Sequence, residues 1–440
     1  MEQFLQGIKK IDIKSFEIKK SSKKTKMNKE TKLNLQHVIS DIVSFGEIDE
    51  SELKEPSEEI VNTIFNMVIE VEQKKSMSTE EESEIKNSII SHLNKSIPVI
   101  SPIYENVEIE RLKLIIKELK KIPQPEQRTP EWYVFRNGRL TASDLGAVMG
   151  YNPYEQYKNV VLKKCGLEMP FVTNKAIKHG VKYEETVTMI YSFRNDLEVY
   201  EYGCIPHPTI PHFGASPDGI VDSNSNNKDY IGRMLEIKCP TGRPITGFCP
   251  EYYWAQVQGQ LEVCDLEYCD FVECLIQEYR TEDEFFNDVG GSNFYNSFGM
   301  EKGVIVDAYD LKLKKEVFYY GKLGMSREEI KKWESDIIDQ IMENENLEYQ
   351  CTSYWKLAKY NALLIKRDVE WWNKEALPKI NQYWSDVLEH RKKPMDELQK
   401  LYKPRTWKKQ IKNGKLDNFV KVDNPIKKNA GFLSDSDDED

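Results

Sequence analysis

The sequence predicts an α/β protein, because stretches with strand periodicity and stretches with helix periodicity follow one another along the chain. Residues 231–239 are predicted to form a strand, since apolar residues alternate there with Glu236 and Lys238. Residues 176–193 and 252–263 instead repeat their apolar side chains at the spacing of an amphipathic helix. Together these segments indicate a sheet with helices packed against it.

Two carboxylates and an ammonium group are predicted to meet at one edge of this sheet. Asp218 lies in a turn between Pro217 and Gly219, and seventeen residues separate it from Glu236. Two strands joined by a loop would bring Asp218, Glu236 and Lys238 together. A divalent metal, a water and a phosphodiester could meet at such a group, since hard cations prefer carboxylate oxygens. The alternative is an exposed Glu and Lys on the polar face of an edge strand.

A third carboxylate lies in the helix predicted at residues 176–193. The apolar stripe of that helix comprises Ile177, Gly180, Val181, Glu184, Val187, Thr188 and Tyr191. Glu184 therefore lies on the buried side, whereas Glu185 points elsewhere together with Lys182. A buried carboxylate needs a partner, which would be either a metal site or an arginine. Gly180 would allow a close backbone approach one turn earlier.

Five ordered motifs make the chain similar to a known family. They are Trp132-Tyr-Val-Phe-Arg136 with Thr141-Ala142-Ser143, Gly180-Val-Lys-Tyr-Glu184, Ser216-Pro-Asp218-Gly, Glu236-Ile-Lys238-Cys-Pro and Ala255-Gln256-Val-Gln258. This order resembles the lambda-exonuclease-like family, and within it the YqaJ viral recombinase branch of the PD-(D/E)XK nucleases. The resemblance covers about residues 128–280, and the whole chain resembles a protein of a large DNA virus. It implies an α/β, restriction-endonuclease-like core, a mixed central sheet flanked by helices, with added helical N- and C-terminal regions.

The resemblance implies a role for each residue of the acidic group. Asp218, Glu236 and the backbone carbonyl of Ile237 would ligate metal, and Glu184 would complete the cluster directly or through water. Lys238 would serve the attacking nucleophile. The expected cofactor is Mg²⁺ or Mn²⁺, with two ions in the site.

A second set of residues matches family positions that hold a 5′-terminal phosphate. These residues are Arg136, Ser143, Ser216 and Gln256. A guanidinium and several hydroxyl and amide donors suit such a group. From the residues alone, a surface pair of Arg136 with Glu131 or Asp144 and an ordinary helix N-cap at residues 141–144 are the favoured interpretations, and Gln258 could be the contributing amide.

The implied activity is a magnesium-dependent 5′-to-3′ exonuclease that degrades double-stranded DNA from its ends, in viral recombination, repair or genome maturation. The alternatives are a structure-specific endonuclease with the same site and a weakly active DNA-end-binding factor. A single-strand annealing protein and further copies of this chain are the expected partners. The resemblance places the chain in the host-cell cytoplasm, at a viral factory, or in the virion.

The formal net charge of −11 does not exclude a DNA partner, because the charges are unevenly distributed. Residues 1–32 hold ten Lys against four acids, residues 401–428 hold nine Lys or Arg against two acids, and five acids lie in residues 434–440. A signal peptide and a long apolar span are both lacking in the sequence, which predicts an intracellular, soluble protein without a membrane partner.

The eight cysteines are scattered and include no C-x-x-C pair, so the spacing of a zinc ribbon is missing. Their distribution also provides no clustered ligand set for an iron–sulfur centre. Cys264, Cys269 and Cys274 are predicted to lie on one strand, with Cys264 and Cys274 on the face opposite Cys269, as core thiols.

The sequence divides into five predicted parts. They are a flexible basic N-terminus (1–31), a helical N-terminal domain (32–122), the exonuclease core (123–346), a helical aromatic-rich C-terminal region (347–428) and an acidic disordered tail (429–440). The aromatic side chains between Tyr354 and Tyr402 would either cover the core or, together with Trp407 and its neighbouring lysines, guide single-stranded DNA.

Overall fold

The computed structural model describes residues 104–125, 129–167, 175–241, 243–292 and 294–402, together with scattered residues within 61–69 and 82–89. Its centre is a seven-stranded sheet. In spatial order the strands are β2 (Val199–Tyr200), β5 (Gly219–Val221), β6 (Met234–Lys238), β7 (Tyr268–Glu278), β10 (Leu347–Lys366), β8 (Lys302–Asp310) and β9 (Lys315–Tyr320). Strands β6 and β7 are parallel and the other pairs of this sheet are antiparallel, so the predicted α/β fold with a mixed sheet is confirmed.

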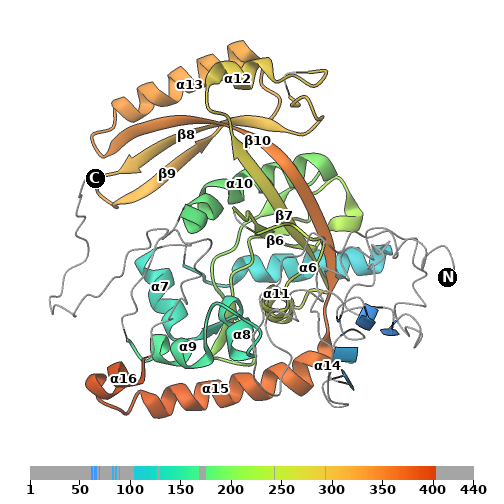
Figure 1. The fold of residues 1–440 in the computed structure, drawn as a ribbon, viewed down its shortest axis with the longest axis vertical. Helices are drawn as coiled ribbons and strands as arrows, with labels where there is room; N and C mark the ends of the chain where they lie inside the picture. The colour runs from blue at the N-terminus through green and yellow to red at the C-terminus, as the bar shows by residue number, and fades with distance from the viewer. Residues whose placement is uncertain are drawn as a thin grey trace.

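Helices cover both faces of this sheet (Figure 1). They are α6 (Asn106–Lys121), α7 (Pro130–Asn137), α8 (Ala142–Val148), α9 (Tyr157–Lys164), α10 (Lys175–Asn195), α11 (Glu251–Cys264), α12 (Glu282–Asn287), α13 (Arg327–Met342), α14 (Val369–Trp371), α15 (Leu377–His390) and α16 (Met395–Leu401). A small sheet of β1 (Leu140–Thr141), β4 (Phe213–Ala215) and β3 (Ile205–Pro206) lies beside them. None of the described helices is both long and apolar enough to cross a bilayer.

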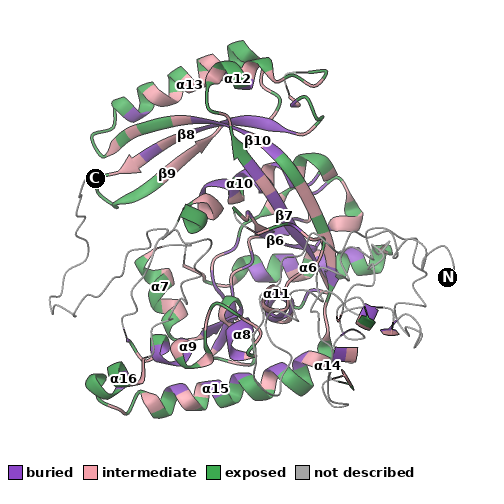
Figure 2. Ribbon diagram, in the orientation of Figure 1, coloured by how far each residue is buried: buried purple, intermediate pink, exposed green. Residues whose placement is uncertain are grey.

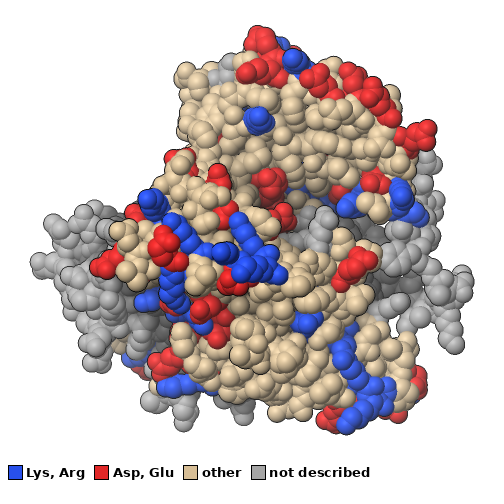
Figure 3. Space-filling model, turned by 180° about the vertical axis from the view of Figure 1, so that it is seen from behind, with Lys and Arg blue, Asp and Glu red and all other residues tan. Residues whose placement is uncertain are grey.

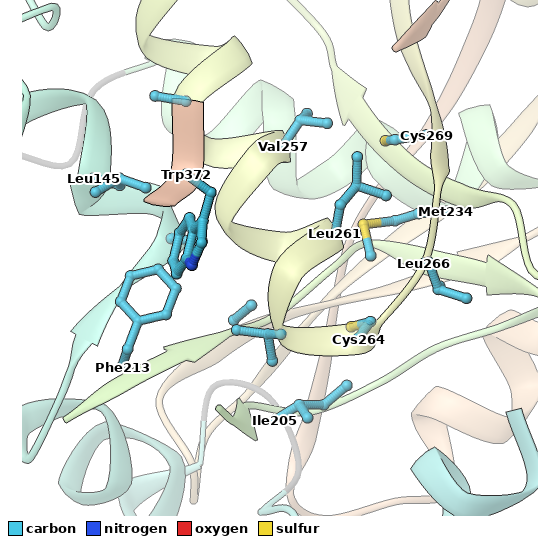
Figure 4. Packing of buried hydrophobic residues seen from close by; sticks show 14 of the residues in the cluster. Leu145, Ile205, Phe213, Met234, Val257, Leu261, Cys264, Leu266, Cys269 and Trp372 are labelled. Atoms are coloured by element: carbon cyan, nitrogen blue, oxygen red, sulfur yellow. The ribbon is translucent and has the colours of Figure 1, made fainter. Parts of the chain in front are cut away.

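The alternation of side chains along β6 and β7 divides the core into two layers. Met234 and Phe271 pack on one face with α6, α8, α11 and α15, whereas Leu235 and Val272 pack on the other face with α10. Figure 4 shows the first layer, in which the residues of α11 lie between the sheet and Trp372. Buried residues follow β6, β7 and β10, while the outer sides of α13 and α15 are exposed (Figure 2). Both faces of the central strands therefore contribute to the core.

The prediction that residues 347–428 are helical is wrong for their first twenty residues. Leu347–Lys366 forms the long strand β10, which pairs with both β7 and β8. The central sheet therefore includes residues beyond the domain boundary predicted at residue 346. Periodicity alone cannot distinguish a long, half-buried strand from a helix when the flanking segments are rich in aromatic residues.

Aromatic side chains of β10 and of the helices after it belong to the core. Trp355 lies in the layer under α10, and Trp372 and Tyr383 lie in the opposite layer, all three nearly inaccessible to solvent. Trp384 stacks on His212 with ring centroids 5.3 Å apart. The interpretation that these side chains cover the core is confirmed for the described residues, whereas Trp407 and the lysines beside it lie outside them. The basic N-terminus, the acidic tail and most of residues 32–103 also lie outside the described part.

The prediction that Cys264, Cys269 and Cys274 share one strand is confirmed only for Cys269 and Cys274, which lie in β7. All eight are free thiols, and Cys269 and Cys274 pack in the two opposite layers of the core. Cys264 ends helix α11 and is not part of the strand. Burial raises the pKa of the Cys264 thiol above its usual range, which disfavours the thiolate that a metal or an oxidant would require.

Gly146 permits the close contact between α8 and α11, and its replacement should destabilise the fold. A Cβ atom at this position would lie 2.7 Å from the Tyr252 carbonyl oxygen, which is backbone and cannot rotate away. We expect Gly146→Ala to lower the free energy of unfolding by about 1–3 kcal/mol.

Gly180 provides the matched control, because a Cβ atom there meets no described atom within 4 Å. The close approach expected at Gly180 is therefore not made by the described residues. Gly180→Ala should raise the free energy of unfolding by up to about 1 kcal/mol through helix propensity. Urea unfolding of both variants tests this pair; equal stabilities would contradict the close contact at Gly146.

Candidate active site

Asp218, the residue before β5, lies opposite Glu236 of the neighbouring strand β6. Gly219 pairs with Leu235 and Ile220 with Met234, so one further step of the antiparallel register places Asp218 beside Glu236. The backbone N–H of Ile237 donates to Asp218 Oδ2 over 2.7 Å. The turn and strand predicted from the sequence thus bring the two carboxylates together.

Glu236 is completely buried. Its Oε1 accepts hydrogen bonds from the Lys238 ammonium and from Gln256 Nε2 (2.6 Å), and its Oε2 accepts one from Gln260 Nε2 (2.7 Å). The alternative of an exposed Glu on an edge strand is therefore wrong, because β6 lies between β5 and β7. Burial of a carboxylate costs desolvation free energy, and these three donors offset that cost.

Charges at this site act strongly on one another. Burial, followed by the carboxylates of Glu236 and Glu184, raises the pKa of Asp218 well above its usual range. Burial disfavours the ammonium form of Lys238, but Glu236 and Asp218 outweigh it and raise the pKa of this lysine. Lys238 is thus an ammonium at neutral pH, and it lies among more carboxylates than it can neutralise.

Glu184 faces this group from α10, and Glu185 does not. Glu184 is half-buried and acts on Asp218, whereas Glu185 is exposed. The buried stripe of α10 differs from the prediction, however. It comprises Lys182, Tyr183, Thr186, Val187, Ile190 and Tyr191. Ile177 is 43% exposed, because the first turns of α10 extend past the sheet.

Lys182 is buried, although the sequence predicts it on the polar face of α10. Its ammonium donates to Asp307 Oδ2 (2.7 Å), Ser353 Oγ (2.6 Å) and Glu278 Oε1 (3.1 Å). The neighbouring Tyr183 hydroxyl also donates to Glu278 Oε1, over 2.5 Å. These contacts fix α10 to β7, β8 and β10 and thereby set the position of Glu184.

The donor set suits a hard cation, although it is not a complete cage. Within the described ranges, no three His, Cys, Asp or Glu side chains are arranged to hold a metal ion. The carboxylate pair nevertheless supplies the oxygens that Mg²⁺ and Mn²⁺ prefer. Gln260 Oε1 is buried with no hydrogen-bond partner among the described residues, so an additional donor such as a metal-bound water fits beside the pair.

Arg136 gathers three hydroxyl groups a short distance from Asp218. Its Nη1 donates to Ser216 Oγ (3.3 Å), and its Nη2 donates to Ser143 Oγ (3.1 Å) and Thr141 Oγ1 (3.3 Å). The guanidinium lies 4.2 Å from the centre of the Trp132 ring, which holds it in place. We call Arg136, Thr141, Ser143 and Ser216 the arginine–hydroxyl cluster.

The pairing of Arg136 with Glu131 or Asp144 is not observed. Asp144 accepts from Thr141 Oγ1 (3.4 Å) and lies 4.0 Å from the Lys164 ammonium. Thr141 is the N-cap residue of α8, but its side chain makes no capping hydrogen bond. Among the described residues, Arg136 has no carboxylate partner, so its positive charge is available to an anion.

The three glutamines of α11 have different partners. Gln256 contacts Glu236 rather than the arginine–hydroxyl cluster, and Gln258 contacts the backbone of Lys366 and Asp368, which makes it structural. Gln260, which the sequence motifs did not include, donates both to Glu236 and to the Ser216 carbonyl (3.3 Å). Its spacing of four residues from Gln256 on one helix face could have revealed it.

Several known proteins are similar to parts of this chain. Residues 131–267 match the family profile of the YqaJ-like viral recombinase domain. An uncharacterized protein of Acanthamoeba polyphaga mimivirus is 36% identical over 358 residues, which are 76% of this chain and 63% of that protein. A protein of African swine fever virus is 26% identical over 164 residues, 31% of this chain and 46% of that protein. The chain therefore spans less than two thirds of either relative.

Two solved exonucleases are also similar. The crystal structure of LHK-Exo from Laribacter hongkongensis with dAMP has 20% identity and a TM-score of 0.35, and covers 62% of this chain and 100% of its own. The phage-related exonuclease from Haemophilus somnus has 14% identity and a TM-score of 0.30, and covers 60% of this chain and 96% of its own.

Proposed function

We propose, from the match of residues 131–267 to the YqaJ-like viral recombinase domain, that the chain is a metal-dependent deoxyribonuclease that degrades DNA from its ends. The observation that carries the proposal is the pairing of Asp218 with the fully buried Glu236, beside Lys238 and facing Glu184. Burial and the neighbouring carboxylates raise the pKa of Asp218, and a divalent cation would relieve the repulsion between these carboxylates.

Asp218, Glu236 and the Ile237 carbonyl would hold the cation, which is Mg²⁺ or Mn²⁺ and would activate a water and stabilise the charge on the phosphate. Glu184 would act through water, since the described carboxylates form no three-residue cage. The raised pKa of Lys238 keeps it an ammonium, so it would orient the attacking water and neutralise charge rather than accept a proton. Gln256 and Gln260 would hold the Glu236 carboxylate in place.

The arginine–hydroxyl cluster would bind the 5′-terminal phosphate and so give the enzyme its 5′-to-3′ direction. A guanidinium with no carboxylate partner among the described residues, together with three hydroxyls, matches the charge and the acceptors of a phosphate. Ser216 belongs to this cluster, lies two residues from Asp218 and is held by Gln260 through its carbonyl. The metal site and the arginine–hydroxyl cluster are therefore close enough for the end of one DNA strand to occupy both.

Magnesium dependence tests this function in its simplest form. Purified chain should degrade linear duplex DNA when MgCl₂ is added, and this degradation should stop when EDTA removes the metal. The release of acid-soluble nucleotide measures the rate of degradation under both conditions. Equal rates with and without the chelator would refute the proposed metal chemistry.

Exchanging Glu184 or Glu185 tests the position of the third carboxylate. Glu184→Gln should raise the Mg²⁺ concentration needed for half-maximal activity by about 10–100-fold, as the removal of an outer-sphere metal partner does. Glu185→Gln, one residue away and exposed, should change it by less than about twofold. A larger effect at Glu185 would show that α10 presents its other side to the metal.

A further inference from the structure

Helix α6 lies outside the family match, which begins at residue 131, yet it is fixed to the same core. Ile109, Leu112, Ile116 and Leu119 form its apolar face and pack with the residues of β6, α8 and α11. The other side carries Lys113, Lys117, Lys120 and Lys121. Because its apolar face is packed against the core, α6 holds these four lysines in fixed positions on the surface of the protein.

These lysines line a cavity of about 390 Å³ together with Ile116 and Ser223. Lys113 and Lys121 pair with Glu110 and Glu118 of the same helix, at 2.8 and 2.6 Å. Such exposed pairs contribute little stability, so a phosphate can replace the carboxylates at small cost. Figure 3 shows Lys and Arg side chains gathered, with Asp and Glu among them, on one side of the face turned away in Figure 1, at the height of α6.

Lys120 also lines a second cavity of about 760 Å³, so the two cavities are neighbours on either side of this side chain, and we call them together the groove. The ammonium of Lys120 lies 4.3 Å from the centre of the Tyr200 ring and 2.8 Å from Asp222. Tyr133, Tyr200 and the exposed Lys315 line the larger cavity. The side chain of Tyr133 is 55% exposed and that of Tyr200 is 44% exposed.

The larger cavity is lined by residues of α7 and α10, the helices that carry Arg136 and Glu184. Tyr133 precedes Arg136 by one turn of α7, and Val181, which also lines the cavity, precedes Glu184 by one turn of α10. Two acids line it, and one of them, Glu316, is paired with Lys178 at 2.7 Å. Exposed aromatic rings and lysines therefore line two neighbouring cavities, to which α7, the helix that carries Arg136, and α6 both contribute.

We propose that this groove binds single-stranded DNA, and that it receives the strand left unpaired when the other strand is degraded; this second part rests on the proposed function. Unpaired bases stack on Tyr133 and Tyr200, and Lys120, Lys117 and Lys121 follow the phosphates. A duplex cannot make the same contacts, because its bases are already stacked on one another. The groove is thereby distinct from the phosphate site, which takes a strand end.

Fluorescence anisotropy with a labelled oligothymidylate, on the full chain in EDTA, tests the groove without any cleavage. Tyr133→Ala with Tyr200→Ala should weaken binding by about tenfold or more, since each stacked base contributes about 1–3 kcal/mol. Lys117→Ala with Lys121→Ala should also reduce the slope of log affinity against log salt by about 1.4, because each phosphate that is no longer neutralised lowers it by about 0.7.

Matched controls lie on other surfaces of the chain. Phe298→Ala, at a ring that is 83% exposed, and Lys332→Ala, on the exposed side of α13, should leave oligothymidylate binding unchanged. Unchanged binding in both groove variants would overturn the proposal, as would wild-type chain that binds a blunt duplex of equal length as tightly. Because no metal is present, these results stand whether or not the chain cleaves DNA.

Discussion

Replacing Asp218 or Glu236 by alanine should abolish magnesium-dependent DNA degradation, with a loss of about a thousandfold or more. Each carboxylate is assigned as a direct metal ligand, and a bound metal supplies several kcal/mol of transition-state stabilisation, where about 1.36 kcal/mol corresponds to a factor of ten. Single-turnover degradation of a linear duplex at saturating Mg²⁺ measures the loss. Asp336→Ala, at an exposed carboxylate of α13, is the matched control and should retain full activity.

Loss of activity must be separated from loss of the fold. Burial and the neighbouring carboxylates raise the pKa of Asp218, so its ionised form is disfavoured in the folded, metal-free chain. Asp218→Asn removes that unfavourable charge and should unfold in urea at the same or a higher midpoint than wild type. An inactive, stable Asp218→Asn variant would support metal ligation, whereas retained activity in either alanine variant would exclude it.

Arg136→Ala should remove the preference for 5′-phosphorylated ends. Wild-type chain should degrade a 5′-phosphorylated duplex about 10–100-fold faster than a 5′-hydroxyl duplex, since charged hydrogen bonds contribute about 1.5–3 kcal/mol. The variant should degrade both at the slower rate. Initial rates on the two substrates, at substrate concentrations below KM, give the ratio.

Two further variants make the Arg136 test specific. Arg136→Lys keeps the charge but loses the planar fork that reaches Ser143 and Ser216 together, so its preference should be intermediate. Arg280→Ala, at an exposed arginine in the turn before α12, should behave as wild type. Equal wild-type rates on both ends would exclude a terminal-phosphate site at the arginine–hydroxyl cluster.

The local chemistry of the site could be predicted from the sequence because it depends on short-range order. The turn at Asp218 and the alternation around Glu236 specify two neighbouring strand positions, and the structure brings these carboxylates together. The meeting of Arg136 with Ser143 and Ser216 also agrees with the motif order. The resemblance supplied that pairing, since composition alone favoured a surface ion pair or a helix cap.

Other features could not be predicted because they depend on contacts between distant segments. Glu236 is buried because β7 and β10 extend the sheet beyond β6, and residues 347–366 alone look as much like a helix as a strand. Lys182 is buried because Asp307 and Ser353, more than a hundred residues away, satisfy its ammonium. The spacing of Gln260 from Gln256 indicates a shared helix face, but the contacts of Gln260 depend on the positions of Ser216 and Glu236 in space.

The direction of degradation tests the central claim most directly. Linear duplex DNA labelled at either the 5′ or the 3′ end, and closed circular DNA of the same sequence, would be incubated with the chain and Mg²⁺. We expect the 5′ label to be released first as a mononucleotide, the 3′ label to stay on a long single strand, and the circle to remain intact. Early release of the 3′ label, or cutting of the circle, would contradict a 5′-to-3′ exonuclease.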